Sequence, residues 1–248
     1  MIILHETANH KNVLFSNLTS GAMVQANQHV IIHENESMLL DPGGHKVYTR
    51  LFGELSSVMP INNMKHIFFS HQDPDIIAAA NGWLMVTDAQ AYLSNLWIRF
   101  IPHFGVDDLV AKKITAIPDR GMVVNVGGLE LKLIPAHFLH SAGNFQVYDP
   151  FAKILYSGDL GASLGADYDI VENFESHIQY MGPFHQRYLP CAKALKMWVK
   201  TVRQLEIETI APQHGAILQG PEMVEKFINW LGNLECGLDL MGDSFPIP

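Results

Sequence analysis

Three polar side chains alternate along one short segment, where together they could bind a metal ion. His71, Asp73 and Asp75 lie two residues apart, directly after an apolar stretch, and the next residue is Ile76. In an extended segment, side chains two residues apart lie on the same side, so one imidazole and two carboxylates converge. This spacing predicts a metal site.

Three further candidate ligands follow apolar strands later in the chain. They are His140, Asp159 and His214, and each has Gly, Ser or Pro beside it. The chain has 13 histidines, so candidate ligands are selected by their position relative to the predicted strands. Seven lie in polar or helical contexts and are expected to have surface or packing roles: His5, His10, His29, His45, His103, His177 and His185. His33 and His66 border strands and are candidates for supporting groups.

A set of three imidazoles and three carboxylates favours iron. Zinc sites commonly use His and Cys ligands, whereas this harder and more anionic set suits non-haem iron or manganese better. We therefore expect iron, with zinc or manganese as alternatives.

Composition limits the classes of partner. The chain has 248 residues, 48% of them hydrophobic, which suits one large domain over residues 1–248. Its net charge of -9 disfavours nucleic acid and anionic membranes as partners. Cys191 and Cys236 form no disulfide framework, the first residues lack a basic leader, and no apolar run approaches the ~20 residues of a membrane span. The sequence predicts a cytoplasmic protein.

The elements that position the candidate ligands are predicted from periodicity and turn residues. Strands are expected within 13–20, 22–36, 37–44, 66–69, 121–136, 144–150, 152–160 and 208–212, and helices over 45–57, 76–85, 192–205 and 221–234, with 88–118 helical between loops. In the helix over 192–205, Met197, Val199, Val202 and Leu205 are expected to face the core. Two series of strands, each followed by helices, predict an α/β fold in which two sheets pack face to face with helices outside, a four-layer αββα sandwich.

The types of the six candidate ligands, and their order along the chain, resemble those of a known family. His71-x-Asp73-x-Asp75, His140, Asp159 and the Pro-Gln-His-Gly around His214 resemble the metallo-β-lactamase superfamily, and most of all the diiron domain of flavodiiron proteins. The resemblance covers nearly the whole chain, although no flavodoxin domain follows, so no flavin is expected to bind. It implies one iron on His71, Asp73 and His140, a second on Asp75 and His214, and a bridging Asp159.

Two departures from that family pattern suggest what the chain binds. Asp73 stands where the family usually has Glu, and Ile76 stands where it has a His ligand of the second metal. An absent imidazole would leave that metal open, and an apolar neighbour would keep it dry, which favours a small uncharged ligand such as O2. The alternative is that Ile76 is ordinary helix core in a relic without metal.

The combination resembles stand-alone oxygen-binding diiron proteins, which implies an O2 sensor or carrier linked to a signalling partner. An O2 or NO reductase fed by an external electron donor is the first alternative, and a metal-dependent hydrolase of the same superfamily is the second, so enzymatic activity stays open. His137 and Tyr156 are candidate supporting residues beside the ligands. The resemblance also implies a homodimer, for which residues 95–104 offer an apolar contact face.

Overall fold

The apolar segments of the chain form two β-sheets in the computed structural model, which describes residues 1–21, 23–245 and 247. The first sheet has seven strands in sequence order: β1 (Ile2–Glu6), β2 (His10–Phe15), β3 (Gln28–His33), β4 (Glu36–Leu40), β5 (Met64–Phe68), β6 (Gln90–Ser94) and β7 (Ile114–Ile117). The second runs β13 (Leu218–Gln219), β12 (Thr209–Pro212), β11 (Ile154–Gly158), β10 (Phe145–Asp149), β9 (Leu129–Pro135) and β8 (Met122–Val126).

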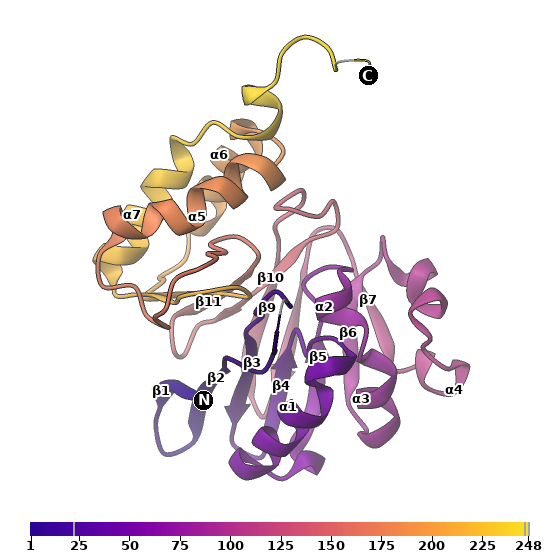
Figure 1. Cartoon of the computed structure of the whole chain (residues 1–248). Coiled ribbons are helices and arrows are strands. Elements are labelled where there is room, and N and C mark those ends of the chain that lie inside the picture. The colour runs from indigo at the N-terminus through magenta and orange to yellow at the C-terminus, as the bar shows by residue number, and fades with distance from the viewer. Residues whose placement is uncertain (22, 246, 248) are drawn as a thin grey trace.

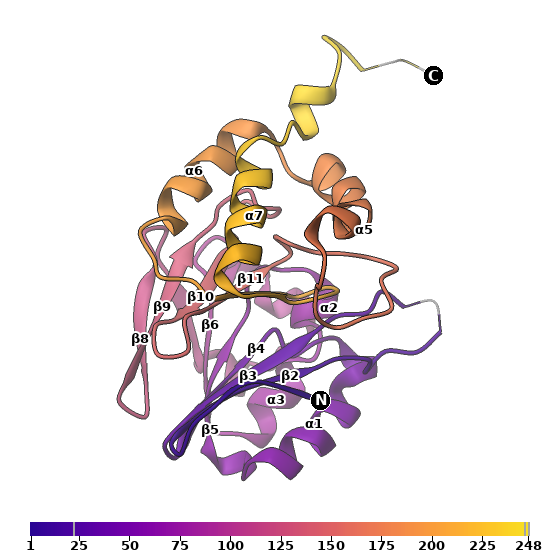
Figure 2. The ribbon, with the colours of Figure 1, turned by 90° about the vertical axis from the view of Figure 1, so that its left-hand side faces the viewer.

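The helices lie on the outer faces of both sheets (Figures 1 and 2). The first sheet carries α1 (His45–Val58), α2 (Pro74–Ile77), α3 (Ala80–Val86) and α4 (Asp108–Ala111), and the second carries α5 (Phe174–Tyr188), α6 (Ala192–Val202) and α7 (Pro221–Gly232). Short 3-10 helices are η1 (Ile61–Asn63), η2 (Ile98–Phe104) and η3 (Gly237–Leu240).

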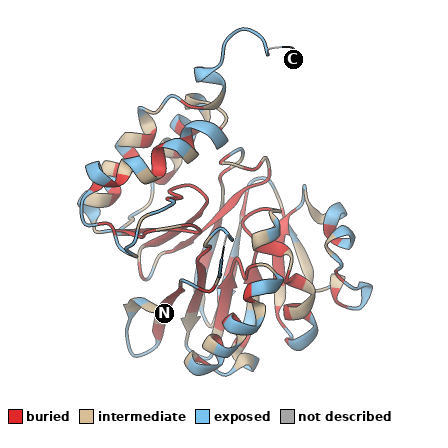
Figure 3. Ribbon diagram, in the orientation of Figure 1, coloured by how far each residue is buried: buried red, intermediate tan, exposed pale blue. Residues whose placement is uncertain are grey.

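Three apolar layers hold these elements together. Leu51 and Trp83 belong to the layer between α1, α3 and the first sheet, whereas Leu195 and Phe227 belong to the layer under α6 and α7. A third layer, which contains Phe145, fills the space between the two sheets. The buried residues accordingly follow the strands and the inner faces of the helices (Figure 3). The predicted four-layer αββα sandwich is confirmed, while the single domain over 1–248 stays a prediction.

Several predicted elements were wrong. Residues 88–118, expected to be helical, contain β6 and β7, and the helix expected over 76–85 is divided into α2 and α3. β6 is a parallel strand buried in the sheet and therefore lacks the alternation that marks a half-exposed strand. The described residues between β2 and β3 form a loop, although strands were expected there, and β1 and α5 were not predicted.

One residue of α6 faces the opposite way from the prediction. Val202 is buried, as expected, but the Met197 side chain is 63% exposed. A residue five positions from Val202 lies on nearly the other side of a helix with 3.6 residues per turn, so both cannot face the core.

No helix among the described residues is long and apolar enough to cross a membrane.

Candidate metal centre

The six predicted ligands all lie beyond the ends of strands or at the start of a helix. His71 follows β5, and Asp73 and Asp75 flank the first residue of α2. The other three ligands come from elsewhere in the chain. His140 lies in the loop between β9 and β10, Asp159 directly follows β11, and His214 lies just beyond the end of β12. The sandwich therefore gathers residues from both sheets at one edge.

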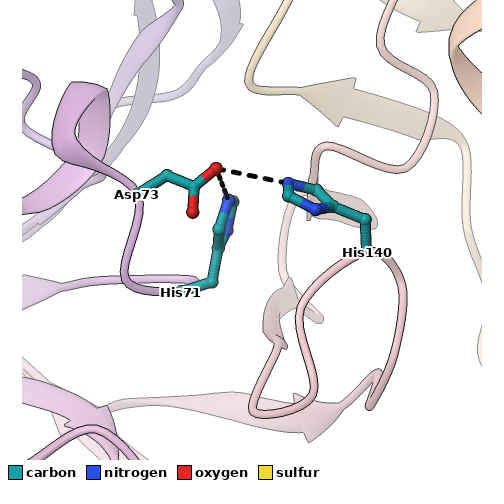
Figure 4. Close-up of side chains that lie close together, drawn as sticks. All are labelled: His71, Asp73 and His140. Carbon is teal, nitrogen blue, oxygen red and sulfur yellow. Dashed lines mark ion pairs between the residues drawn. The ribbon is translucent and has the colours of Figure 1, made fainter. Parts of the chain in front are cut away.

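The first half of the candidate centre contains His71, Asp73 and His140 (Figure 4). One ligand atom from each lies within 4.8 Å of the other two, and Asp73 Oδ2 is 3.6 Å from His71 Nε2 and 3.5 Å from His140 Nε2. Two ligand atoms that each lie about 2.1 Å from one ion, at about 90–120°, are separated by roughly 3.0–3.6 Å. These separations fit ligands of one ion.

The second half contains Asp75 and His214, and Asp159 lies between the halves. Asp75 Oδ2 is 3.4 Å from His214 Nε2. Asp159 Oδ2 lies 2.9 Å from His140 Nε2, whereas its other oxygen, Oδ1, lies 3.7 Å from His214 Nε2. One carboxylate thus faces each half with a different oxygen, which is the geometry a bridging ligand requires.

Two buried polar atoms support a metal at this place. His71 Nε2 and Asp159 Oδ1 are both shielded from solvent, and neither has a hydrogen-bond partner among the described residues. Leaving such an atom unsatisfied costs about 1–3 kcal/mol. A cation between the six side chains would satisfy both atoms, so the residues present fit a metal-ion pair.

Hydrogen bonds orient two of the imidazoles. His214 Nδ1 donates to the Gln25 carbonyl oxygen at 2.8 Å, and because a carbonyl only accepts, the neutral ring keeps its Nε2 lone pair for the centre. His71 Nδ1 lies 3.0 Å from Ser70 Oγ, and the Ser70 amide donates to Asp41 Oδ1 at 2.7 Å. Gln25, Ser70 and Asp41 were not predicted; the Asp-Pro-Gly-Gly turn at Asp41 was the one sequence signal.

The side chains are strongly coupled electrostatically. Burial alone would lower the pKa of His71, but Asp73, Asp159 and Asp41 outweigh it and raise that pKa to about 9. Burial would raise the pKa of Asp159, but the hydrogen bond from His140 and the nearby His71 and His214 lower it to about 2. Without a metal, the centre therefore favours imidazolium beside carboxylate; a cation would take over the role of those protons.

Aromatic rings from α5 pack against the first half. The Phe184 and Tyr188 rings lie 6.0 Å and 5.9 Å from the His140 ring between centroids, both nearly perpendicular to it, and they stack on each other at 4.8 Å. They lie against one side of the His140 ring. Sequence reasoning missed both because it did not predict α5.

The three predicted supporting residues have other contacts in the structure. Ile76 is fully buried in the apolar layer that contains Leu51 and Trp83. His137 Nε2 donates to the Asp119 carbonyl oxygen at 2.9 Å, and the Tyr156 hydroxyl accepts from Asn12 at 2.8 Å. His33 and His66 likewise contact other groups. His33 lies against His10, and His66 contacts Tyr92 and Glu36. A supporting role for Ile76, His137 or Tyr156 stays a prediction.

Comparison with known proteins identifies the family. A model of the family described as "ODP family beta lactamase" matches residues 24–215, well over half of the chain. The chain belongs to the ODP family. A structure described as the peroxy diiron species of the chemotaxis sensor ODP is 40% identical, with a TM-score of 0.87, and the match covers 96% of this chain and 97% of that one. The apo state of ODP from T. denticola is 39% identical over 96% of both chains, with a TM-score of 0.86.

Two more distant matches also cover most of this chain. The rubredoxin oxygen:oxidoreductase from the anaerobe Desulfovibrio gigas is 14% identical with a TM-score of 0.79, and the match covers 93% of this chain but 61% of that protein. An uncharacterized protein of Methanocaldococcus jannaschii is 24% identical over 82% of this chain and 52% of its own length. The chain thus spans about half the length of this curated relative.

Proposed function

We propose that this chain binds two iron ions through His71, Asp73, His140, Asp75, His214 and the bridging Asp159, and that it binds O2 there as a cytoplasmic sensor. The observation that carries the proposal is the position of Asp159, whose two oxygens face two His/Asp half-sites. Membership of the ODP family supports it, because a relative 40% identical is described as a peroxy diiron chemotaxis sensor. A signalling protein would be the partner.

The residues of the chain would prepare the centre for a small neutral ligand. Ferrous ions supply reversible redox chemistry with O2 when bound. The Gln25 carbonyl holds His214 in the tautomer that presents Nε2, and Asp159 keeps its negative charge at neutral pH. Phe184 and Tyr188 place aromatic rings beside His140. With Ile76 in the apolar layer, the second half receives no donor from that position.

Oxygen titration of the iron-loaded protein tests this function. The chain is purified and loaded with ferrous iron without oxygen, and absorption spectra are recorded as O2 is added. We expect a new band that saturates when O2 matches the loaded centres. An unchanged spectrum would contradict O2 binding. Sustained consumption of O2 or NO with an external electron donor would instead favour the reductase, and zinc with ester or lactam cleavage would favour the hydrolase.

We also propose a homodimer. Residues 95–104 contain η2 and the residues just before it. Leu96, before η2, and Phe100, within it, are exposed, whereas Ile101 is buried. The exposed pair offers apolar area that a second copy would cover. Sedimentation of the full chain tests this proposal: replacing both Leu96 and Phe100 with Ser should shift a dimer to monomer, and a dimer that persists would place the contact elsewhere.

A further inference from the structure

An apolar groove lies behind the loop that carries His140. It has a volume of about 480 Å³ and runs between residues 135–139 and α6. Phe138 and Leu139 line it from the loop, and Met197 and Trp198 line it from the helix. Clefts of roughly 300–1,000 Å³ with mostly apolar walls are typical sites for small molecules.

Two large apolar side chains in the walls of the groove are exposed. Phe138 is 56% exposed, and Met197 is 63% exposed although it was expected in the core. Isolated exposed apolar residues are common, but two such side chains facing one cavity form a patch that a ligand could cover. Methionine also adapts its shape to different apolar ligands.

A single positive charge borders this apolar surface. Lys193 is the one Lys, Arg, Asp or Glu side chain among the described lining residues. Within the described part of the chain, the ion pairs of lysine and arginine involve Lys11, Lys153, Arg203 and Lys226, which leaves Lys193 available. The exposed Lys193 cation beside this apolar cleft favours a ligand with an anionic end group.

We infer that this groove binds an amphipathic carboxylate, with its chain against Phe138, Met197 and Trp198 and its carboxylate at Lys193. The ligand is a free molecule of the size of a medium-chain fatty acid. It occupies a site separate from the six candidate metal ligands, and its binding does not depend on the proposed O2 function.

Calorimetric titration of the metal-free full chain with decanoate, below its micelle concentration, tests the inference. We expect saturable binding of one decanoate, and about three- to fourfold tighter binding for each methylene added between hexanoate and decanoate. Decanol should bind about tenfold more weakly than decanoate, because it lacks the charge that Lys193 selects.

Three charge substitutions on the same helix locate the site. Lys193→Glu and Met197→Glu each place a negative charge in the groove and should weaken decanoate binding by about tenfold or more. Lys196→Glu makes the same charge change on an exposed residue that does not line the groove, and binding should stay within about twofold. All three side chains are exposed, so the fold should survive, which circular dichroism checks.

Three results would overturn the inference: no saturable binding, equal weakening by Lys196→Glu and Lys193→Glu, or decanol binding as tightly as decanoate. Because the titration uses protein without iron, a failure here leaves the oxygen titration untouched. The reverse also holds, since a chain that binds decanoate but not O2 would keep this site and lose the proposed function.

Discussion

The two halves of the candidate centre hold different numbers of protein donors. The first has His71, Asp73 and His140 within 4.8 Å of one another, whereas the second has Asp75 and His214 at 3.4 Å. Both halves share Asp159. An ion in the second half would therefore meet one protein donor fewer, and the Asp75 side chain is also the most exposed of the carboxylates, at 41%.

The difference indicates a division of roles between the halves. An ion with more protein donors is held more tightly, and an ion with fewer donors has more room for a ligand from outside. We therefore expect the first half to anchor the centre and the second half to bind the small ligand. The following predictions are ordered from the largest expected effect to the smallest.

Asp159→Asn should remove both halves at once. The amide keeps the shape of the side chain but loses the charge and the second anionic oxygen, so iron affinity should fall by about 100-fold or more. Metal analysis of protein loaded without oxygen measures the effect. Asp167→Asn, in an exposed part of the following loop, is the matched control and should retain its iron. Equal iron in both variants would show that Asp159 does not join the halves.

His140→Ala and His214→Ala should differ from each other. His214→Ala removes one of two donors from the second half, and we expect it to keep about one iron per chain, held by the first half. His140→Ala damages the half that anchors the centre, and we expect less than one iron per chain. Iron stoichiometry after dialysis against a weak chelator separates the two. The opposite order would reverse the assignment of the anchoring half.

The first half should also make the metal-free protein sensitive to pH. The pKa of His71, about 9, exceeds its ordinary value near 6.5, so its stabilising contribution is complete below about pH 6.5 and is lost as pH rises through about 9. The difference in unfolding free energy between wild type and His71→Gln should therefore shrink by about 3 kcal/mol across that range. Urea unfolding at pH 6 and pH 10 measures it; a constant difference would contradict the coupling.

Ile76→His tests whether residue 76 lies close enough to the second half to supply a metal donor. Both Ile76 and Ile77 are fully buried in the same apolar layer, so a histidine at either position should cost about 1–3 kcal/mol in metal-free protein. If residue 76 borders the second ion, iron should recover most of that loss in Ile76→His and little in the control Ile77→His. Thermal unfolding with and without iron compares them, and equal recovery would place Ile76 in the core alone.

The sequence predicted which side chains come together better than it predicted the elements around them. The six candidate ligands are polar residues that follow apolar strands, so their spacing was visible, and the structure brings all six together. β6 and α5 were missed for a physical reason. β6 is buried on both faces, and α5 contains Pro183 and two histidines on its buried side, so neither shows a clean period in its apolar residues.

The supporting contacts could not be predicted because they depend on tertiary packing. Gln25 reaches His214 across 189 positions, and it does so with its backbone carbonyl, which every residue has. Tyr188 meets His140 only because the fold packs the end of α5 against the loop that carries His140. The exposure of Met197 could have been predicted from the sequence, because residues 197 and 202 cannot both lie on the buried face of one helix.

The loop before β10 has two faces, and this has a thermodynamic consequence. Phe138 and Leu139 wall the groove, His140 belongs to the candidate centre, and Ser141 Oγ donates to Gln72, whose amide in turn donates to Asp73. If a groove ligand and iron favour different loop geometries, each must change the affinity of the other by the same factor. The affinity of the centre would then depend on the concentration of the groove ligand as well, so oxygen would be only one of the two ligands to which the chain responds.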